Sequence, residues 1–121
     1  MEARNTSWIS YHYTGTLYRD NNHNGAYGAG DKLLPDGLFV QVIRVVEADD
    51  DLYQYGTVIA QGYTSGNSEY DVLVWDYYYD SNYYYYLAAP LVPSDCSGYL
   101  PNKYQVYFNM NVNRNFGAQP N

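Results

Sequence analysis

Apolar and polar residues alternate along most of the chain with the period of two that is typical of half-buried β-strands. No stretch places apolar residues at helical spacing over about 11 or more positions. The pattern predicts an all-β chain with six strands, at Ser7–Arg19, Leu38–Val46, Gln54–Gly62, Glu69–Tyr79, Tyr83–Ala88 and Tyr104–Val112.

The last of these segments has the clearest alternation. Its apolar residues are Val106, Phe108, Met110 and Val112, each separated from the next by one other residue. Because successive strand side chains point to opposite faces, the pattern puts all four on one buried face.

Connections rich in Gly, Pro, Asn, Asp and Ser separate the predicted strands, and the longest are Asp20–Gly37 and Pro90–Asn102. Six or seven short strands at this spacing favour two sheets packed face to face, with a small barrel as the alternative. The 121 residues suffice for one core. We therefore expect residues 1–121 to form a single β-sandwich domain.

The two ends of the chain differ from this pattern. The tail 113–121 is polar and contains Gly117 and Pro120. We expect this tail and an N-terminal arm, residues 1–6, to dock on neighbouring subunits of an assembly.

The charge balance is acidic, with a formal net charge of −7. Binding of a nucleic-acid backbone depends on Lys and Arg that displace counterions, so we expect no nucleic-acid partner. Nowhere do the roughly 18 apolar residues needed for a membrane-spanning helix run together, so we expect no membrane insertion. Met1–Ser10 lacks a basic run followed by an apolar stretch, so we expect no export signal.

The connection from Asp20 to Asp31 has the spacing of a calcium-binding loop. Oxygen-bearing side chains stand at its first, third, fifth and twelfth positions, and Gly25 stands at the sixth, where a sharp turn is needed. The candidate ligands are Asp20, Asn22, Asn24, the backbone carbonyl of Ala26, and Asp31. A metal-free loop held by Asx turns is the alternative.

The run Gly15–Asp31, followed by Leu34–Val42 and later by Ser65–Val72, resembles SdrD B-like domains, which belong with CnaB-type modules. The likeness covers about Gly15 to Val74. It implies an Ig-like (Greek-key, prealbumin-like) β-sandwich of six to seven strands, a structural calcium site in the first loop, and a stalk, spacer or display role. Some relatives form an isopeptide crosslink from a first-strand Lys, which this chain lacks, so no crosslink is expected.

A cluster of tyrosines surrounds Asp80-Ser81-Asn82 and resembles two strand ends joined by a polar turn. Its members are Tyr77, Tyr78, Tyr79, Tyr83, Tyr84, Tyr85 and Tyr86. Tyr beside Ser, Asn and Asp is typical of adaptable binding surfaces, so contact with a host receptor or a glycan is one interpretation. The other is that the rings pack across strands or against a neighbouring subunit.

The sequence offers little catalytic chemistry. Nucleophilic catalysis needs a base beside a Ser or Cys, and the two histidines, His12 and His23, have no evident partner. Cys96 is the single cysteine, and the acids of Glu47–Asp51 are most simply a solvated turn. We therefore predict a protein that is not an enzyme.

Two functional hypotheses remain. The first is a structural subunit of a larger assembly, such as the virion surface, capsid-decoration or tail protein of a bacteriophage. The second is a bacterial cell-surface or extracellular adhesin or stalk domain that binds glycan or protein through its tyrosine hairpin.

Overall fold

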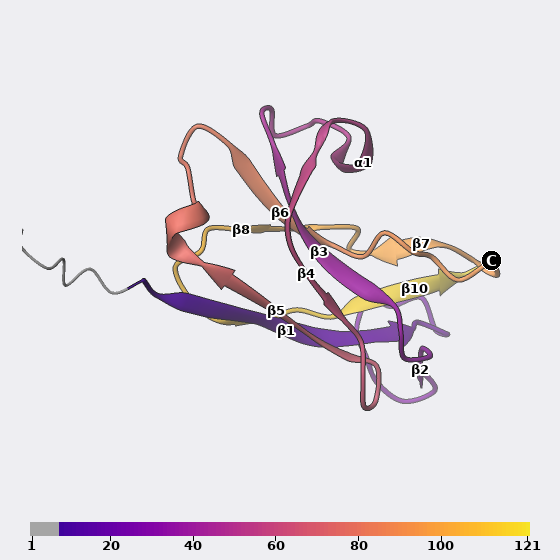
Figure 1. The fold of residues 1–121 in the computed structure, drawn as a ribbon. Helices are drawn as coiled ribbons and strands as arrows, with labels where there is room; N and C mark the ends of the chain where they lie inside the picture. The colour runs from indigo at the N-terminus through magenta and orange to yellow at the C-terminus, as the bar shows by residue number, and fades with distance from the viewer. Residues whose placement is uncertain (1–7) are drawn as a thin grey trace, which may run out of the picture.

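The computed structural model describes residues 8–121, which form two β-sheets packed face to face (Figure 1). The predicted all-β sandwich is confirmed. Helical structure in the described part of the chain is limited to one turn, α1 (Leu52–Tyr55), and one 3-10 turn, η1 (Asp76–Tyr78).

The first sheet is organised around the long strand β1. Along one half of β1 the strand order is β2-β1-β10-β7, and β5 and β9 pair with the other half. The strands are β1 (Ser10–Arg19), β2 (Lys32–Leu33), β5 (Glu69–Trp75), β7 (Cys96–Leu100), β9 (Val112–Asn113) and β10 (Phe116–Pro120).

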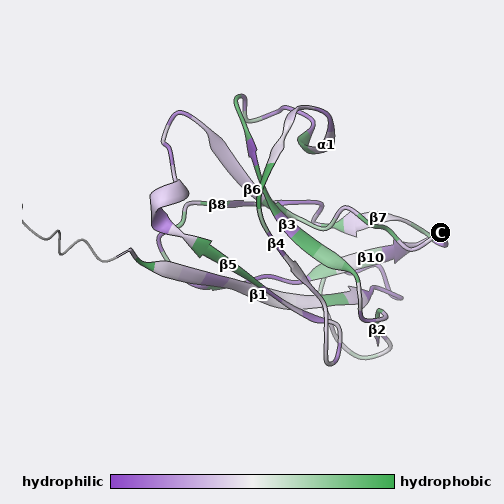
Figure 2. Cartoon of the chain, viewed as in Figure 1, coloured by the Kyte–Doolittle hydropathy of each residue, from purple (hydrophilic) through white to green (hydrophobic). Residues whose placement is uncertain are grey.

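The second sheet has the order β4-β3-β6-β8. Its strands are β3 (Phe39–Val45), β4 (Thr57–Tyr63), β6 (Tyr84–Ala88) and β8 (Tyr104–Val106). All its pairings are antiparallel. Figure 2 shows hydrophobic residues on the central strand β3 and at the end of β5.

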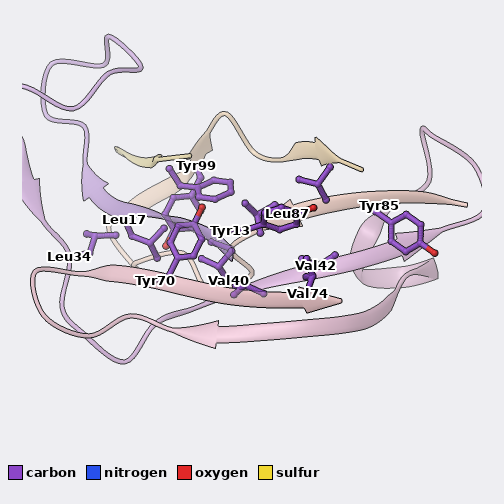
Figure 3. Packing of buried hydrophobic residues seen from close by; sticks show 14 of the residues in the cluster. Tyr13, Leu17, Leu34, Val40, Val42, Tyr70, Val74, Tyr85, Leu87 and Tyr99 are labelled. Carbon is purple, nitrogen blue, oxygen red and sulfur yellow. The ribbon is translucent and has the colours of Figure 1, made fainter. Parts of the chain in front are cut away.

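The core between the sheets combines aliphatic side chains with tyrosine rings (Figure 3). Leu17, Val42 and Leu87 are fully buried, and so are the rings of Tyr13 and Tyr85. A buried hydroxyl needs a partner, and the core tyrosines find theirs on the backbone. Five donate to backbone carbonyl oxygens: Tyr70 to Arg114, Tyr85 to Tyr78, Tyr86 to Ala48, Tyr99 to Leu91 and Tyr104 to Asn115.

The predicted strand Tyr104–Val112 is wrong beyond Val106. Phe108 takes a left-handed conformation, φ 55°, which breaks the strand, and its ring is buried against Tyr13 and Tyr85. Met110, predicted on the buried face, is 56% exposed. Val106 and Phe108 are both buried as predicted, but Val106 ends β8, and a turn rather than a continuous strand carries Phe108 into the core.

Two other predicted strands are too long. The segment predicted from Gln54 begins as α1, because the Asp51 carboxylate caps that turn by accepting from the N–H groups of Tyr53 and Gln54. The segment predicted to Tyr79 ends at Trp75 and continues as η1.

The C-terminal tail is also corrected. β10 lies between β1 and β7 in the first sheet, with Phe116, Gly117 and Ala118 buried, so residues 116–120 are held within the same chain. β7 and β10 run side by side at the end of the molecule that carries the C-terminus (Figure 1). The predicted arm, residues 1–6, lies outside the described residues.

Candidate functional site

Asp20 anchors the predicted calcium loop from a fully buried position. Its carboxylate accepts hydrogen bonds from the N–H groups of Asn24 and Gly25, at 3.2 and 2.8 Å, and from the side-chain amide of Gln119 at 2.7 Å. Burial raises the pKa of this carboxyl, but the three hydrogen bonds outweigh burial and hold the pKa below its usual value.

The other side-chain oxygens of the loop also face backbone amides. The Asp31 carboxylate accepts from the N–H groups of Asn21 and Gly28, at 2.9 and 3.0 Å. Asn22 and Asn24 accept from the N–H two residues further on, which is the Asx-turn arrangement. The loop is therefore closed by its own hydrogen bonds.

This geometry bears on how well the loop suits calcium. The oxygen types fit a hard cation, but each of the four side chains already accepts from an N–H, and only the remaining lone pairs are free. Within residues 8–121 no three His, Cys, Asp or Glu side chains are grouped closely enough to hold a metal ion. A calcium site here would thus rest on two carboxylates, two Asn side chains and a backbone carbonyl.

The structure separates the tyrosine cluster into exposed and buried members. Tyr77, Tyr78, Tyr79 and Tyr84 are exposed, and Tyr83 is half-buried beneath the Arg44 guanidinium, 4.4 Å from the ring centre. Tyr85 and Tyr86 are buried, so both are removed from the predicted binding surface.

The burial of Tyr85 and Tyr86 has a plain cause. Both lie on β6, an interior strand of its sheet, and their hydroxyls donate to the carbonyl oxygens of Tyr78 and Ala48. Their rings therefore stabilise the fold.

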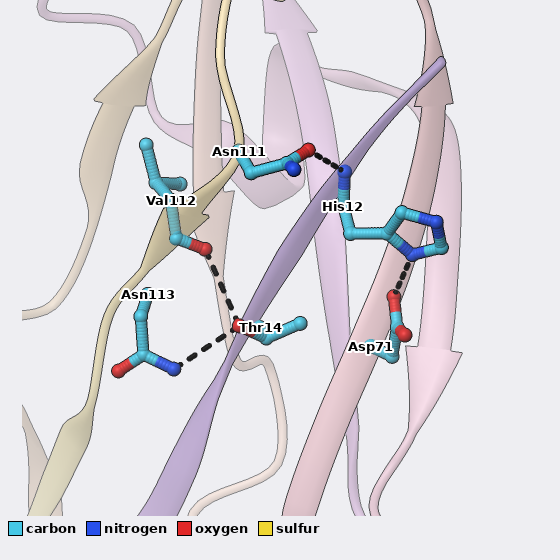
Figure 4. Close-up of polar contacts among 6 residues, drawn as sticks. All are labelled: His12, Thr14, Asp71, Asn111, Val112 and Asn113. Atoms are coloured by element: carbon cyan, nitrogen blue, oxygen red, sulfur yellow. Dashed lines mark hydrogen bonds and ion pairs between the residues drawn. The ribbon is translucent and has the colours of Figure 1, made fainter.

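A second polar cluster lies on the outer face of β1 and β5 (Figure 4). The His12 imidazole Nδ1 is 2.7 Å from the Asp71 carboxylate, and both side chains are about half exposed. The His12 backbone N–H donates to the Asn111 side-chain carbonyl at 2.8 Å. The sequence placed His12 on a strand but did not find its partner, because Asp71 is adjacent only after β1 pairs with β5.

The neighbouring hydroxyl is held in place. Thr14 accepts a hydrogen bond from the Asn113 side-chain amide at 3.0 Å and directs its own proton to the Val112 carbonyl oxygen at 3.4 Å (Figure 4). It is therefore a poor nucleophile in this arrangement, since no base accepts its proton.

A shallow hollow of about 440 Å³ opens beside this cluster. Its walls carry hydroxyl, amide and carboxylate groups from Thr14, Tyr63, Glu69, Asp71 and Asn113. Tyr63 comes from the other sheet: β4 approaches so closely that a Cβ on Gly62 would lie 2.2 Å from the Asp71 carbonyl oxygen.

An aromatic cluster stands at the far end of the same strands. Tyr77 is the central ring: Trp8 meets it edge-on with centroids 4.7 Å apart, Trp75 stacks on it at 6.0 Å, and Tyr78 lies at 4.6 Å. Neither tryptophan was among the predicted site residues. The alternation of Glu69, Asp71, Leu73 and Trp75 on one face of β5 was a signal that could have identified this surface.

His23, in the Asp20–Asp31 loop, also has a side-chain partner. Its Nδ1 is 2.9 Å from the side-chain oxygen of Gln119, whose amide binds Asp20. This short relay ties the loop to β10.

These observations define the protein as a β-sandwich whose outer β1–β5 face is exposed to solvent. No family model matches the chain, and no curated protein matches it. Within residues 8–121 no helix is long and apolar enough to cross a membrane.

Solved structures with a similar fold include a pollen allergen and a pilin. The major plantain pollen allergen Pla l 1 superposes with a TM-score of 0.53 at 14% identity, over 93% of this chain and 94% of the allergen. The full-length major pilin SpaD from Corynebacterium diphtheriae superposes with a TM-score of 0.48 at 11% identity, over 93% of this chain and 33% of the pilin. At such low identity the first likeness shows the fold alone.

Proposed function

We propose that this protein is a non-catalytic structural and display module, of the SdrD B-like or CnaB-type kind, that assembles with further copies of itself. The observation that carries the proposal is the open edge of β4. An edge strand presents unpaired N–H and C=O groups, and natural proteins usually protect such an edge with charge or proline.

β4 has neither protection. Its sequence, Thr57 to Tyr63, contains no charged residue and no proline, and none of its residues is buried. It pairs with β3 on one side and is the terminal strand of its sheet. It is protected in part by a register shift opposite Val42 and Ile43, and by the close approach of β5 to Gly62.

A second copy is a suitable partner for this edge. Two antiparallel β4 strands would join the sheets across a two-fold axis, and neither strand carries a charged side chain into the new pairing. An uncharged contact strand favours self-association, because each copy carries a formal charge of −7 and the copies otherwise repel each other.

The setting that we propose is the surface of a virion, as a decoration or tail component. A bacterial cell surface, where the protein would act as an adhesin or stalk, is the second candidate. The exposed Tyr77, Tyr78 and Tyr79 support the adhesin, because exposed aromatic side chains are typical of recognition surfaces.

The test is the oligomeric state of the purified protein, measured by light scattering after size-exclusion chromatography. We expect the parent to form dimers or larger species, and Val58→Lys, at an edge position 48% exposed, to be monomeric. Val46→Lys is the matched control, because Val46 is 60% exposed and lies outside β4. A monomeric parent at every concentration, or equal loss of assembly in both variants, contradicts the proposal.

A further inference from the structure

We propose that the outer face of β1 and β5 binds a neutral oligosaccharide, which stacks on the aromatic cluster of Trp8, Trp75 and Tyr77 and extends into the polar hollow beside Asp71. The proposed site includes Tyr63 at the end of β4 and otherwise lies on a different surface from the β4 edge. The proposal does not depend on self-assembly.

The aromatic cluster is built as a firm platform. Two hydrogen bonds tie the start of β1 to the end of β5: the Asp76 N–H donates to the Ile9 carbonyl oxygen at 2.9 Å, and the Ile9 N–H donates to the Asp76 carboxylate at 3.2 Å. Tyr77 then contacts both tryptophan rings. Rings that fix one another lose little conformational freedom when a ligand binds.

Two of these rings are exposed despite their size, and Trp75 is half-buried. Trp8 is 54% and Tyr77 is 45% exposed. The C–H faces of a pyranose ring are apolar, so they gain by covering an aromatic face, whereas the hydroxyls around the ring's rim still need hydrogen-bond partners.

The hollow supplies such partners a short distance away. Asp71 and Glu69 are acceptors, Asn113 and Thr14 offer an amide and a hydroxyl, and Tyr63 is a ring that is 60% exposed with a hydroxyl at its tip. A few oriented polar groups beside aromatic side chains are the usual lining of a small-molecule site.

The spacing indicates an oligomer rather than a single sugar. Asp71 and Trp75 lie on the same face of β5, four residues apart, which corresponds to roughly 13 Å along a strand. Between them Leu73 is 43% exposed, so the surface continues without a gap in exposure.

The acidic side chains of this face disfavour anionic ligands. Glu69 and Asp71 disfavour phosphate, sulfate or uronate groups, and His12, the basic side chain of the cluster, is already paired with Asp71.

The experiment uses the protein's own fluorescence. Both tryptophans of the chain, Trp8 and Trp75, belong to the platform, so tryptophan emission reports on this surface alone. The neutral probes are cellohexaose, xylohexaose, maltohexaose and N-acetylchitohexaose, with a heparin hexasaccharide as the anionic comparison. We expect a saturable change in emission with at least one neutral probe and none with heparin.

Calorimetry with the responding probe then tests the two halves of the site. Trp75→Ala and Asp71→Ala should each weaken binding roughly tenfold or more. Tyr53→Ala is the control, because Tyr53 is 56% exposed but lies in α1. Circular dichroism verifies that each variant is folded, and Val58→Lys should bind like the parent.

Three results would overturn the proposal. One is the absence of any emission change with all four neutral probes. Another is unchanged affinity in both Trp75→Ala and Asp71→Ala. The third is loss of self-association in Trp75→Ala, which would make this face a protein interface instead.

Discussion

The hydroxyl oxygen of Tyr13 accepts a hydrogen bond of 2.8 Å from the backbone N–H of Phe108, 95 residues further along the chain. This bond fixes the turn at which the chain leaves β8, and both side chains are buried. Tyr13→Phe would leave the Phe108 N–H without a partner inside the core.

We expect Tyr13→Phe to lower the free energy of unfolding by about 1–3 kcal/mol, the usual effect of leaving a buried donor unpaired. Urea denaturation measures this change. Tyr107→Phe is the control, because Tyr107 is 51% exposed, and it should be nearly neutral. Equal stability of the two variants would show that the bond contributes nothing.

Buried tyrosines should also make the fold sensitive to alkali. Burial raises the pKa of Tyr13 and of Tyr99 to about 12, whereas an unfolded tyrosine titrates near 10. The folded state therefore holds its protons longer than the unfolded state does. The stability that this contributes is complete below about pH 10 and is lost as the pH rises towards 12.

Denaturation curves at rising pH measure this loss. Tyr99→Phe should flatten the decline between pH 10 and 12, because one of the groups that titrates differently in the two states is gone. A decline identical to that of the parent would contradict the assignment.

Gly15 is a position where no side chain fits. Its φ is +157°, and a Cβ there would lie 1.7 Å from the Arg114 carbonyl oxygen, a backbone atom held by the pairing of its segment with β1. We expect Gly15→Ala to cost about 3 kcal/mol or to prevent folding. Gly28→Ala, with nothing within 4 Å of the added Cβ, should change the melting temperature little.

The Asp20–Asp31 loop gives the metal prediction. We propose a weak calcium site, because every candidate side chain already accepts an N–H. Calcium at about ten times its dissociation constant should raise the free energy of unfolding by about 1.4 kcal/mol, and EGTA should reverse the effect. Asp31→Ala should abolish the response. An unchanged melting temperature at millimolar calcium would leave the loop as a metal-free Asx-turn structure.

Short-range pattern was enough to predict the sandwich and several of its strands. β1, β3 and β6 fall within predicted segments because each alternates buried and exposed residues or is continuously apolar. The turns of the Asp20–Asp31 loop could also be predicted from the sequence, because they depend on Asn and Gly at fixed positions.

The sequence alone could not place what depends on distant partners. β10 is short and contains Gly117 and Pro120, and it becomes a strand because β1 and β7 offer hydrogen bonds on both sides. Asparagine side chains complete the edge of β1 in the same way, with Asn115 accepting from the Thr16 N–H at 2.9 Å. No local pattern reveals such pairings.

The amino-acid sequence by itself determined the class of fold, because alternation with period two and turn residues are local properties. Only the tertiary structure decided which tyrosines are core and which are surface, since each sits in a similar local sequence. The tertiary structure also brings the His12 side chain to Asp71, and it places the rings of Trp8 and Trp75 against Tyr77. The physical reason is that strand register brings together residues far apart in the chain, and register follows from the packing of the whole sandwich.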